Sequence, residues 1–109
     1  MDKIHEAVSR LSSGLVDIFG SRLDQIILYG SVARDTQTAE FDIDIAVILR
    51  GYTPSMHDQM TDLAVDLELE YDLVLSVLLI DYTEYKEWED ILPFFQNVKK
   101  DGIVLWQAA

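Results

Sequence analysis

The segment FDIDIAVIL (residues 41–49) restricts what this chain can fold into more than any other segment. It is apolar apart from Asp42 and Asp44, and a short apolar run of this kind is typical of a strand buried in a sheet. Aspartate is rare in strands, and a carboxylate buried without a partner is energetically costly. The segment therefore predicts a buried strand with a polar site at its N-terminal end.

The spacing of the two aspartates places them on the same face of this strand. Side chains alternate between faces along a strand. One face would carry Phe41, Ile43, Ile45, Val47 and Leu49, and the other would carry Asp42, Asp44, Ala46 and Ile48. Residues two apart in a strand have Cα atoms about 7 Å apart. Both carboxylates can therefore converge on one metal ion or on an adjacent pair of ions.

Two like charges at this separation repel each other and resist full ionisation. A divalent cation removes the conflict, and oxygen ligands favour Mg²⁺ or the related Mn²⁺. Magnesium binds few carboxylates and completes its coordination with water and substrate phosphates. The pattern thus predicts a nucleotide beside the metal, although an Asp-x-Asp pair on its own is more often an exposed strand edge.

Asp72 is the candidate for a third carboxylate. It stands near the start of YDLVLSVLLI (residues 71–80), which is expected to be a second buried strand. If this strand runs beside residues 42–49, Asp72 could face the same site. Glu68 and Glu70 are close in sequence but fall where the preceding helix is expected to end, so Asp72 is preferred.

Gly30, Ser31 and Arg34 are the candidates for phosphate binding. Gly30 ends the short apolar segment QIILYG (residues 25–30), and a glycine there lets the backbone approach a phosphate. Ser31 would begin a short helix, whose free amides and dipole favour an anion. Arg34 lies one turn further and could reach the same phosphates. Taken singly, the Gly-Ser pair is usually a turn and Arg34 a surface residue.

The remaining segments predict a single domain spanning residues 1–109, of the mixed α/β (α+β) class. Helices are expected over residues 3–19 and 56–69, and from Pro93 onward with Gly102 beyond the end of the helix, with a short helix within residues 81–90. Strands are expected over residues 25–30, 41–49, 71–80 and 103–106. This order indicates one sheet with helices packed against it.

Composition limits the classes of function. Eight basic and twenty acidic residues give a formal charge of −12, which would repel nucleic acid. Without cysteine the chain cannot form disulfides or thiolate metal sites, which fits a cytoplasmic protein. No apolar run is long enough to span a membrane, and the first residues do not resemble a signal peptide.

Gly30-Ser31, ten intervening residues and Asp42-Ile43-Asp44 resemble the signature of the DNA polymerase beta-like nucleotidyltransferase superfamily. The chain is especially similar to minimal nucleotidyltransferases, which are often antitoxins paired with a HEPN-domain toxin. The segments YDLVLSVLLI and LPFFQNVKKDGIVLW also resemble this family. The resemblance covers most of the chain and implies a palm-like fold, with a mixed sheet of about four strands flanked by helices.

The resemblance also implies roles for individual residues. Asp42 and Asp44 would hold two Mg²⁺ ions, and Asp72 would be a third ligand and base. Gly30 and Ser31 would bind the triphosphate, with Arg34 nearby. The sequence departs from many family members at two positions, where Asp35 replaces glycine and Phe41 replaces serine.

The resemblance implies a Mg²⁺-dependent transfer of AMP from ATP to a tyrosine of a HEPN toxin. A second hypothesis is a non-catalytic module that neutralises its partner by occlusion, and a third is modification of a small molecule. No direct binding of nucleic acid or membrane is expected, whereas a homo- or hetero-oligomer is compatible with the sequence. The aromatic residues Trp88, Phe94, Phe95 and Trp106 belong either to the core or, if exposed together, to a partner surface.

Overall fold

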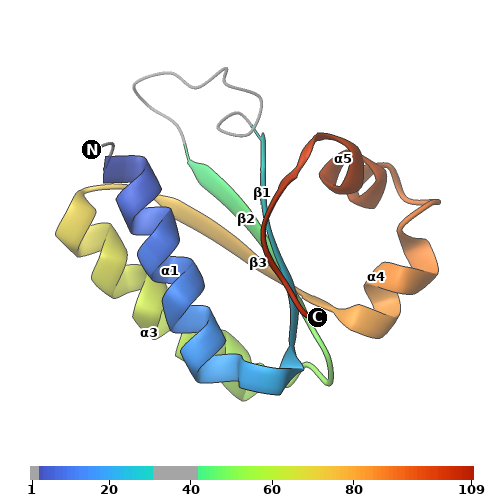
Figure 1. Cartoon of the computed structure of the whole chain (residues 1–109), viewed down its shortest axis with the longest axis horizontal. Coiled ribbons are helices and arrows are strands. Elements are labelled where there is room, and N and C mark those ends of the chain that lie inside the picture. The colour runs from blue at the N-terminus through green and yellow to red at the C-terminus, as the bar shows by residue number, and fades with distance from the viewer. Residues whose placement is uncertain (1–2, 31–41) are drawn as a thin grey trace.

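The computed structural model describes residues 3–30 and 42–109, which form a mixed sheet between two layers of helices (Figure 1). The elements in chain order are α1 (Lys3–Phe19), the 3-10 turn η1 (Gly20–Arg22), β1 (Leu23–Tyr29), β2 (Ile43–Leu49), α3 (Pro54–Tyr71), β3 (Leu75–Asp81), α4 (Tyr82–Trp88), α5 (Pro93–Asp101) and β4 (Ile103–Gln107). The strand order is β3-β2-β1-β4. β1 runs antiparallel to β2 and β4, while β2 and β3 are parallel. This architecture confirms the predicted α+β class.

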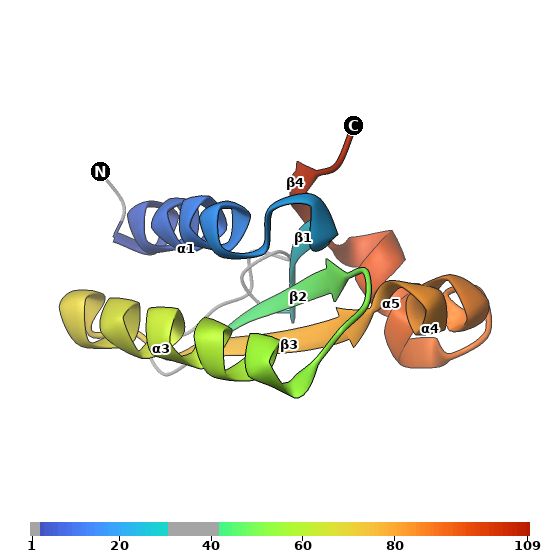
Figure 2. The same cartoon turned by 90° about the horizontal axis from the view of Figure 1, so that it is seen from below.

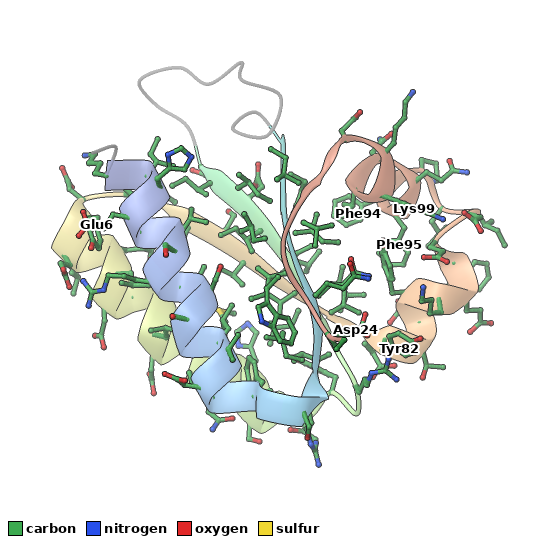
Figure 3. All side chains as sticks on the ribbon, viewed as in Figure 1. Glu6, Asp24, Tyr82, Phe94, Phe95 and Lys99 are labelled. Atoms are coloured by element: carbon green, nitrogen blue, oxygen red, sulfur yellow. The ribbon has the colours of Figure 1, made fainter. Side chains whose placement is uncertain are left out.

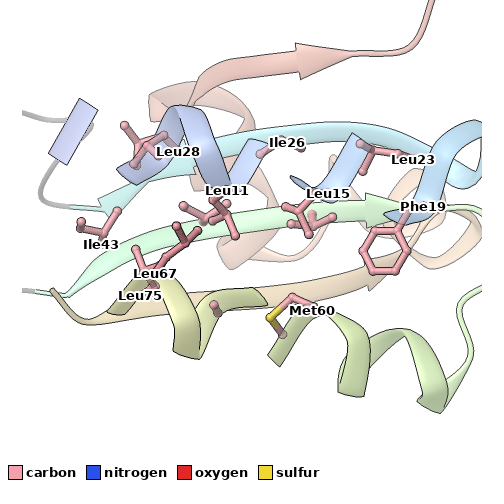
Figure 4. Packing of buried hydrophobic residues seen from close by; sticks show 14 of the residues in the cluster. Leu11, Leu15, Phe19, Leu23, Ile26, Leu28, Ile43, Met60, Leu67 and Leu75 are labelled. Atoms are coloured by element: carbon pink, nitrogen blue, oxygen red, sulfur yellow. The ribbon is translucent and has the colours of Figure 1, made fainter. Parts of the chain in front are cut away.

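The long helices α1 and α3 pack on one face of the sheet, and the short helices α4 and α5 pack on the other (Figure 2). The core under α1 and α3 is the larger of the two. Leu11 and Leu15 of α1 meet Ile43, Ile45 and Val47 of β2 there, all with no exposed surface (Figure 4). Gly14 brings α1 close to α3, because a Cβ at this position would lie 2.6 Å from Cδ2 of Leu63.

The core under α4 and α5 is smaller. It consists of Ile27, Ala46, Ile48, Ile80, Tyr85, Phe95 and Val98. Ala46 and Ile48 belong to this core, whereas Ile43, Ile45 and Val47 belong to the other one. The predicted alternation of faces along β2 is therefore confirmed from Ile43 onward, and Phe41 lies outside the described residues.

Strand starts differ from the sequence predictions. β1 begins at Leu23, before the predicted Gln25, and β2 begins at Ile43, after Asp42. β3 begins at Leu75 instead of Tyr71, because α3 continues through Tyr71. The Tyr71 hydroxyl donates to Glu6 Oε1 at 2.9 Å, and this contact with α1 holds the last turn of α3 in place.

Asp72 ends α3 in a left-handed conformation with φ 54° and ψ 51°, and its amide donates to the Glu68 carbonyl. The sequence prediction that Asp72 stands at the start of a strand is therefore wrong. The helix also begins earlier than predicted, at Pro54, a residue that suits the first turn of a helix. The short helix within residues 81–90 is confirmed as α4, which Asp81 caps by accepting from the Thr83 amide at 3.0 Å.

Candidate functional site

The candidate site lies at the end of the sheet where β2 begins. Tyr29 of β1, Asp44 of β2 and Ser76 of β3 are neighbours across the three strands. Asp44 and Tyr29 share a face with the residues of the smaller core, since Ala46 and Ile48 follow Asp44 at alternate positions. Asp44 is half-buried, and its register partner Tyr29 packs on Phe94 of α5.

Asp42 directly precedes β2 and is exposed. Its carboxylate accepts a hydrogen bond from the Ser76 hydroxyl, with 3.4 Å between Ser76 Oγ and Asp42 Oδ2. Ser76 is in turn the register partner of Asp44. The structure thus brings Asp42 and Asp44 to the same end of one strand, beside one hydroxyl, as the spacing predicts.

Gly30 lies directly against Asp44. Its φ of 77° falls in the left-handed region that favours glycine. A methyl group at this position would overlap the Asp44 Oδ2 atom. Both the backbone angle and the contact therefore require glycine here. Ser31 and Arg34, the other two predicted phosphate-binding residues, lie outside the described residues, as does Asp35.

Asp72 is exposed at the end of α3 and is not brought into a common metal-binding group with Asp42 and Asp44. Within residues 3–30 and 42–109, no three His, Cys, Asp or Glu side chains are close enough together to hold a metal ion. The two glutamates that were set aside make other contacts. Glu68 accepts from the Leu75 amide at 2.9 Å, and Glu70 pairs with Arg10.

Tyr29 and Phe94 form an aromatic pair next to the carboxylates, which the sequence analysis did not single out. Their ring centroids are 5.6 Å apart in an edge-to-face arrangement. Burial raises the pKa of Tyr29, and the charge of Asp44 raises it further. The only sequence signal for this pair was the position of Tyr29, immediately before Gly30.

Phe94 belongs to a set of exposed apolar side chains on α4, α5 and their connection, which we call the α4–α5 apolar surface. Its members are Trp88, Ile91, Leu92 and Phe94, between 38% and 62% exposed. Phe95 instead points into the smaller core (Figure 3). Trp106 packs against the larger core. The four predicted aromatic residues thus divide between core and surface.

Paired charges lie at the other end of β1 and β2. Asp24 is buried and binds Arg50 at 2.9 Å, and the Arg50 guanidinium lies 3.9 Å from the centre of the Tyr82 ring. On α5, Lys99 pairs with the exposed Asp90 at 3.1 Å, and this contact raises the pKa of Lys99. Since these charges are paired with one another, the Asp42–Asp44 end is the candidate catalytic site.

Residues 15–109 match the family described as Polymerase beta, Nucleotidyltransferase. A candidate protein adenylyltransferase of Methanocaldococcus jannaschii is 31% identical over 101 residues, which cover 93% of this chain and 96% of the relative. The chain belongs to the polymerase beta nucleotidyltransferase family. This membership confirms the resemblance and the predicted enzyme class.

Solved structures share the fold. A chain in a crystal structure of a toxin–antitoxin with AMP-PNP is 28% identical, with a TM-score of 0.59. The match covers 90% of this chain and 72% of that one. A chain in a complex of the tri-AMPylated HEPN toxin of Shewanella oneidensis with an MNT antitoxin is 23% identical, with a TM-score of 0.53. That match covers 98% of this chain and 74% of the other.

None of the helices in the described ranges combines the length and the apolar character needed to cross a membrane.

Proposed function

We propose that this protein is a Mg²⁺-dependent adenylyltransferase that moves AMP from ATP to a tyrosine of a HEPN-domain toxin and so acts as an antitoxin. The observation that carries the proposal is the pairing of Asp42 and Asp44 at one end of β2, against Gly30. The M. jannaschii relative supports protein adenylylation as the activity. The similar toxin–antitoxin structure with AMP-PNP supports ATP as the donor and an antitoxin role.

The donor set fits magnesium. Asp42 and Asp44 would hold the two ions that the family resemblance implies, because their oxygen atoms are the ligands this ion prefers. When bound, the metal offsets the charge of the triphosphate and of the departing pyrophosphate. Gly30, Ser31 and Arg34 would bind the triphosphate. Asp72 is retained as a candidate third ligand and base that variants must test.

The chemical step is an in-line displacement at the α-phosphorus of ATP. The tyrosine oxygen of the partner bonds to this phosphorus, while the bond to the bridging oxygen breaks and pyrophosphate departs. The phenolic proton passes to a base at the site, for which Asp72 is the candidate that the family resemblance implies. The chain's own residues thus position the phosphates and take up the proton.

The partner would reach the site over the α4–α5 apolar surface. Phe94 lies beside Tyr29, the register partner of Asp44, so this surface begins next to the carboxylates. Exposed apolar side chains that are close together mark protein contacts. The formal charge of −12 favours a basic partner and disfavours nucleic acid. We propose that residues 1–109 act as one domain in the cytoplasm.

The test is to incubate the protein with ATP, Mg²⁺ and the HEPN-domain protein encoded beside it, and to measure the partner's mass. We expect added adenylate on a tyrosine of the partner, with release of pyrophosphate. The double variant Asp42→Asn/Asp44→Asn should give none. Unmodified partner after incubation with the native protein, under conditions where the two bind, would reject the proposal.

The second candidate function is neutralisation by occlusion without chemistry, which the α4–α5 apolar surface favours. The same double variant separates the two functions. Full neutralisation of the toxin by Asp42→Asn/Asp44→Asn would establish occlusion, whereas its loss with retained binding would support catalysis.

A further inference from the structure

Four aromatic rings follow one another from the candidate site into the smaller core. The ring centroids of Tyr29 and Phe94 are 5.6 Å apart, and those of Phe94 and Phe95 are 5.8 Å apart. The row ends at Tyr85, whose ring centroid lies 5.5 Å from that of Phe95. Phe95 and Tyr85 are buried, whereas Phe94 remains 41% exposed. Phe94 is therefore an exposed ring that is held in place by a ring on each side.

The outer end of this row lies at the carboxylates. Tyr29 is the register partner of Asp44 across β1 and β2, and it packs against the smaller core on the same side of the sheet. Gly30, the next residue along the chain, lies directly against the Asp44 carboxylate. Within the α4–α5 apolar surface, Phe94 is thus the member that the row of rings connects to the candidate site.

A ring in this position suits an aromatic ligand. Stability does not explain an exposed ring here, since an aromatic side chain stabilises a fold mainly through the surface that it buries. Aromatic rings favour one another as neighbours in edge-to-face or offset-stacked pairs. A tyrosine fits especially well, because its hydroxyl stands at the far end of its ring. The ring can lie against Phe94 while the oxygen reaches toward Asp44.

We infer that Phe94, held by Tyr29, is an acceptor-binding residue that receives the ring of the partner's tyrosine and orients its hydroxyl for attack. The inference rests on the proposed function, because it concerns the acceptor of the same reaction. It adds the residue of this chain that makes an aromatic acceptor suitable. Orientation of a reacting group lowers the barrier to its reaction, so the contact would raise kcat.

The experiment measures transfer of adenylate from ATP to the HEPN-domain protein by the full chain with Mg²⁺. It determines kcat, the KM for the partner and the KM for ATP. Phe94→Leu keeps an apolar side chain but removes the ring, and it should lower kcat about tenfold without changing the KM for ATP. Phe94→Tyr keeps the ring and should restore the native kcat.

Two further variants serve as controls. Ile91→Ala is the matched change within the α4–α5 apolar surface, where Ile91 is 62% exposed and carries no ring. It should raise the KM for the partner rather than lower kcat. Phe94→Met also lacks a ring and should behave as Phe94→Leu does, so the result does not depend on one substitution. Thermal unfolding followed by circular dichroism shows that each variant is folded in the assay.

A native kcat in Phe94→Leu and Phe94→Met would overturn the inference, as would a low kcat that Phe94→Tyr does not restore. A raised KM for ATP with an unchanged kcat would also overturn it, because Phe94 would then contact the nucleotide. Failure of the proposed function looks different, since the native protein would then bind the partner without adenylating it. That result would overturn both proposals.

Discussion

The two faces of the sheet differ in how completely helices cover them. The face under α1 and α3 is closed along the whole of β2, where Ile43, Ile45 and Val47 have no exposed surface. The other face is covered less completely by α4 and α5, so that Ile48 is buried while Leu78 of β3 is 41% exposed. The carboxylates of Asp42 and Asp44 lie on this more open face. One strand thus stabilises the fold on one face and offers a reactive site on the other.

The largest expected effect comes from the closed face. Ile45→Ala should lower the free energy of unfolding by about 2–5 kcal/mol, because it leaves a cavity among fully buried side chains. Leu78→Ala is the matched change on the open face and should cost less than about 1 kcal/mol. Urea unfolding of both variants measures the difference. Similar losses would show that the two faces are equally important for stability.

The next largest effect concerns catalytic activity on the more open face. Asp44→Asn should reduce adenylate transfer at least about 100-fold, since it removes a charged ligand from the centre of the site. Its unfolding midpoint should stay close to the native value. Asp72→Asn tests the candidate third ligand without straining the backbone, because asparagine tolerates the left-handed conformation of residue 72. A loss of transfer in Asp72→Asn as large as in Asp44→Asn would support Asp72 as a ligand or base, whereas native activity would remove it from the site.

Gly30→Ala tests the contact between β1 and Asp44. It should lower the free energy of unfolding by about 1–2 kcal/mol through its positive φ, and it should also weaken Mn²⁺ binding by displacing the Asp44 carboxylate. Gly20→Ala is the matched control, because φ is 52° there and no atom lies within 4 Å of the added Cβ. If both variants bind Mn²⁺ equally, the Gly30–Asp44 contact does not shape the site.

The smallest effect is alkaline destabilisation through Tyr85, a buried residue of α4 in the smaller core. Burial, and then the charge of Glu89, raises the pKa of Tyr85 above the ordinary tyrosine value of about 10. Above that value the unfolded chain loses this proton before the folded protein does, so stability falls as pH rises toward the folded pKa. The free energy of unfolding of Tyr85→Phe, measured with urea, should fall less steeply above about pH 10 than that of the native protein. An equally steep fall in both proteins would contradict a raised pKa at Tyr85.

The succession of helices and strands along the chain, and the side of the sheet that Asp44 faces, could be predicted from the sequence, because both follow from local periodicity. The position of Asp72 could not. The apolar run after residue 71 looks continuous, but α3 extends through Tyr71 because that residue contacts Glu6 and Arg10 of α1. Such a contact between distant segments leaves no local pattern in the sequence.

Ser76 was missed for a related reason. Its place beside Asp42 and Asp44 depends on the register between β2 and β3, which the sequence of either strand does not specify. A serine in an apolar strand also gives no signal of metal chemistry by itself. The one available sign was that Leu75, Val77 and Leu79 alternate with it, which assigns Ser76 to the opposite face.

The most direct test of the central claim is to locate bound Mn²⁺ on the native protein by paramagnetic broadening of its amide NMR signals, with AMP-PNP present. We predict strong broadening around Gly30, Asp42, Asp44 and Ser76, and none of it in Asp42→Asn/Asp44→Asn. Amides near Asp24, at the other end of β1, should stay sharp. Broadening centred on the acidic surfaces of α3 or α4, and unchanged in the double variant, would contradict the account.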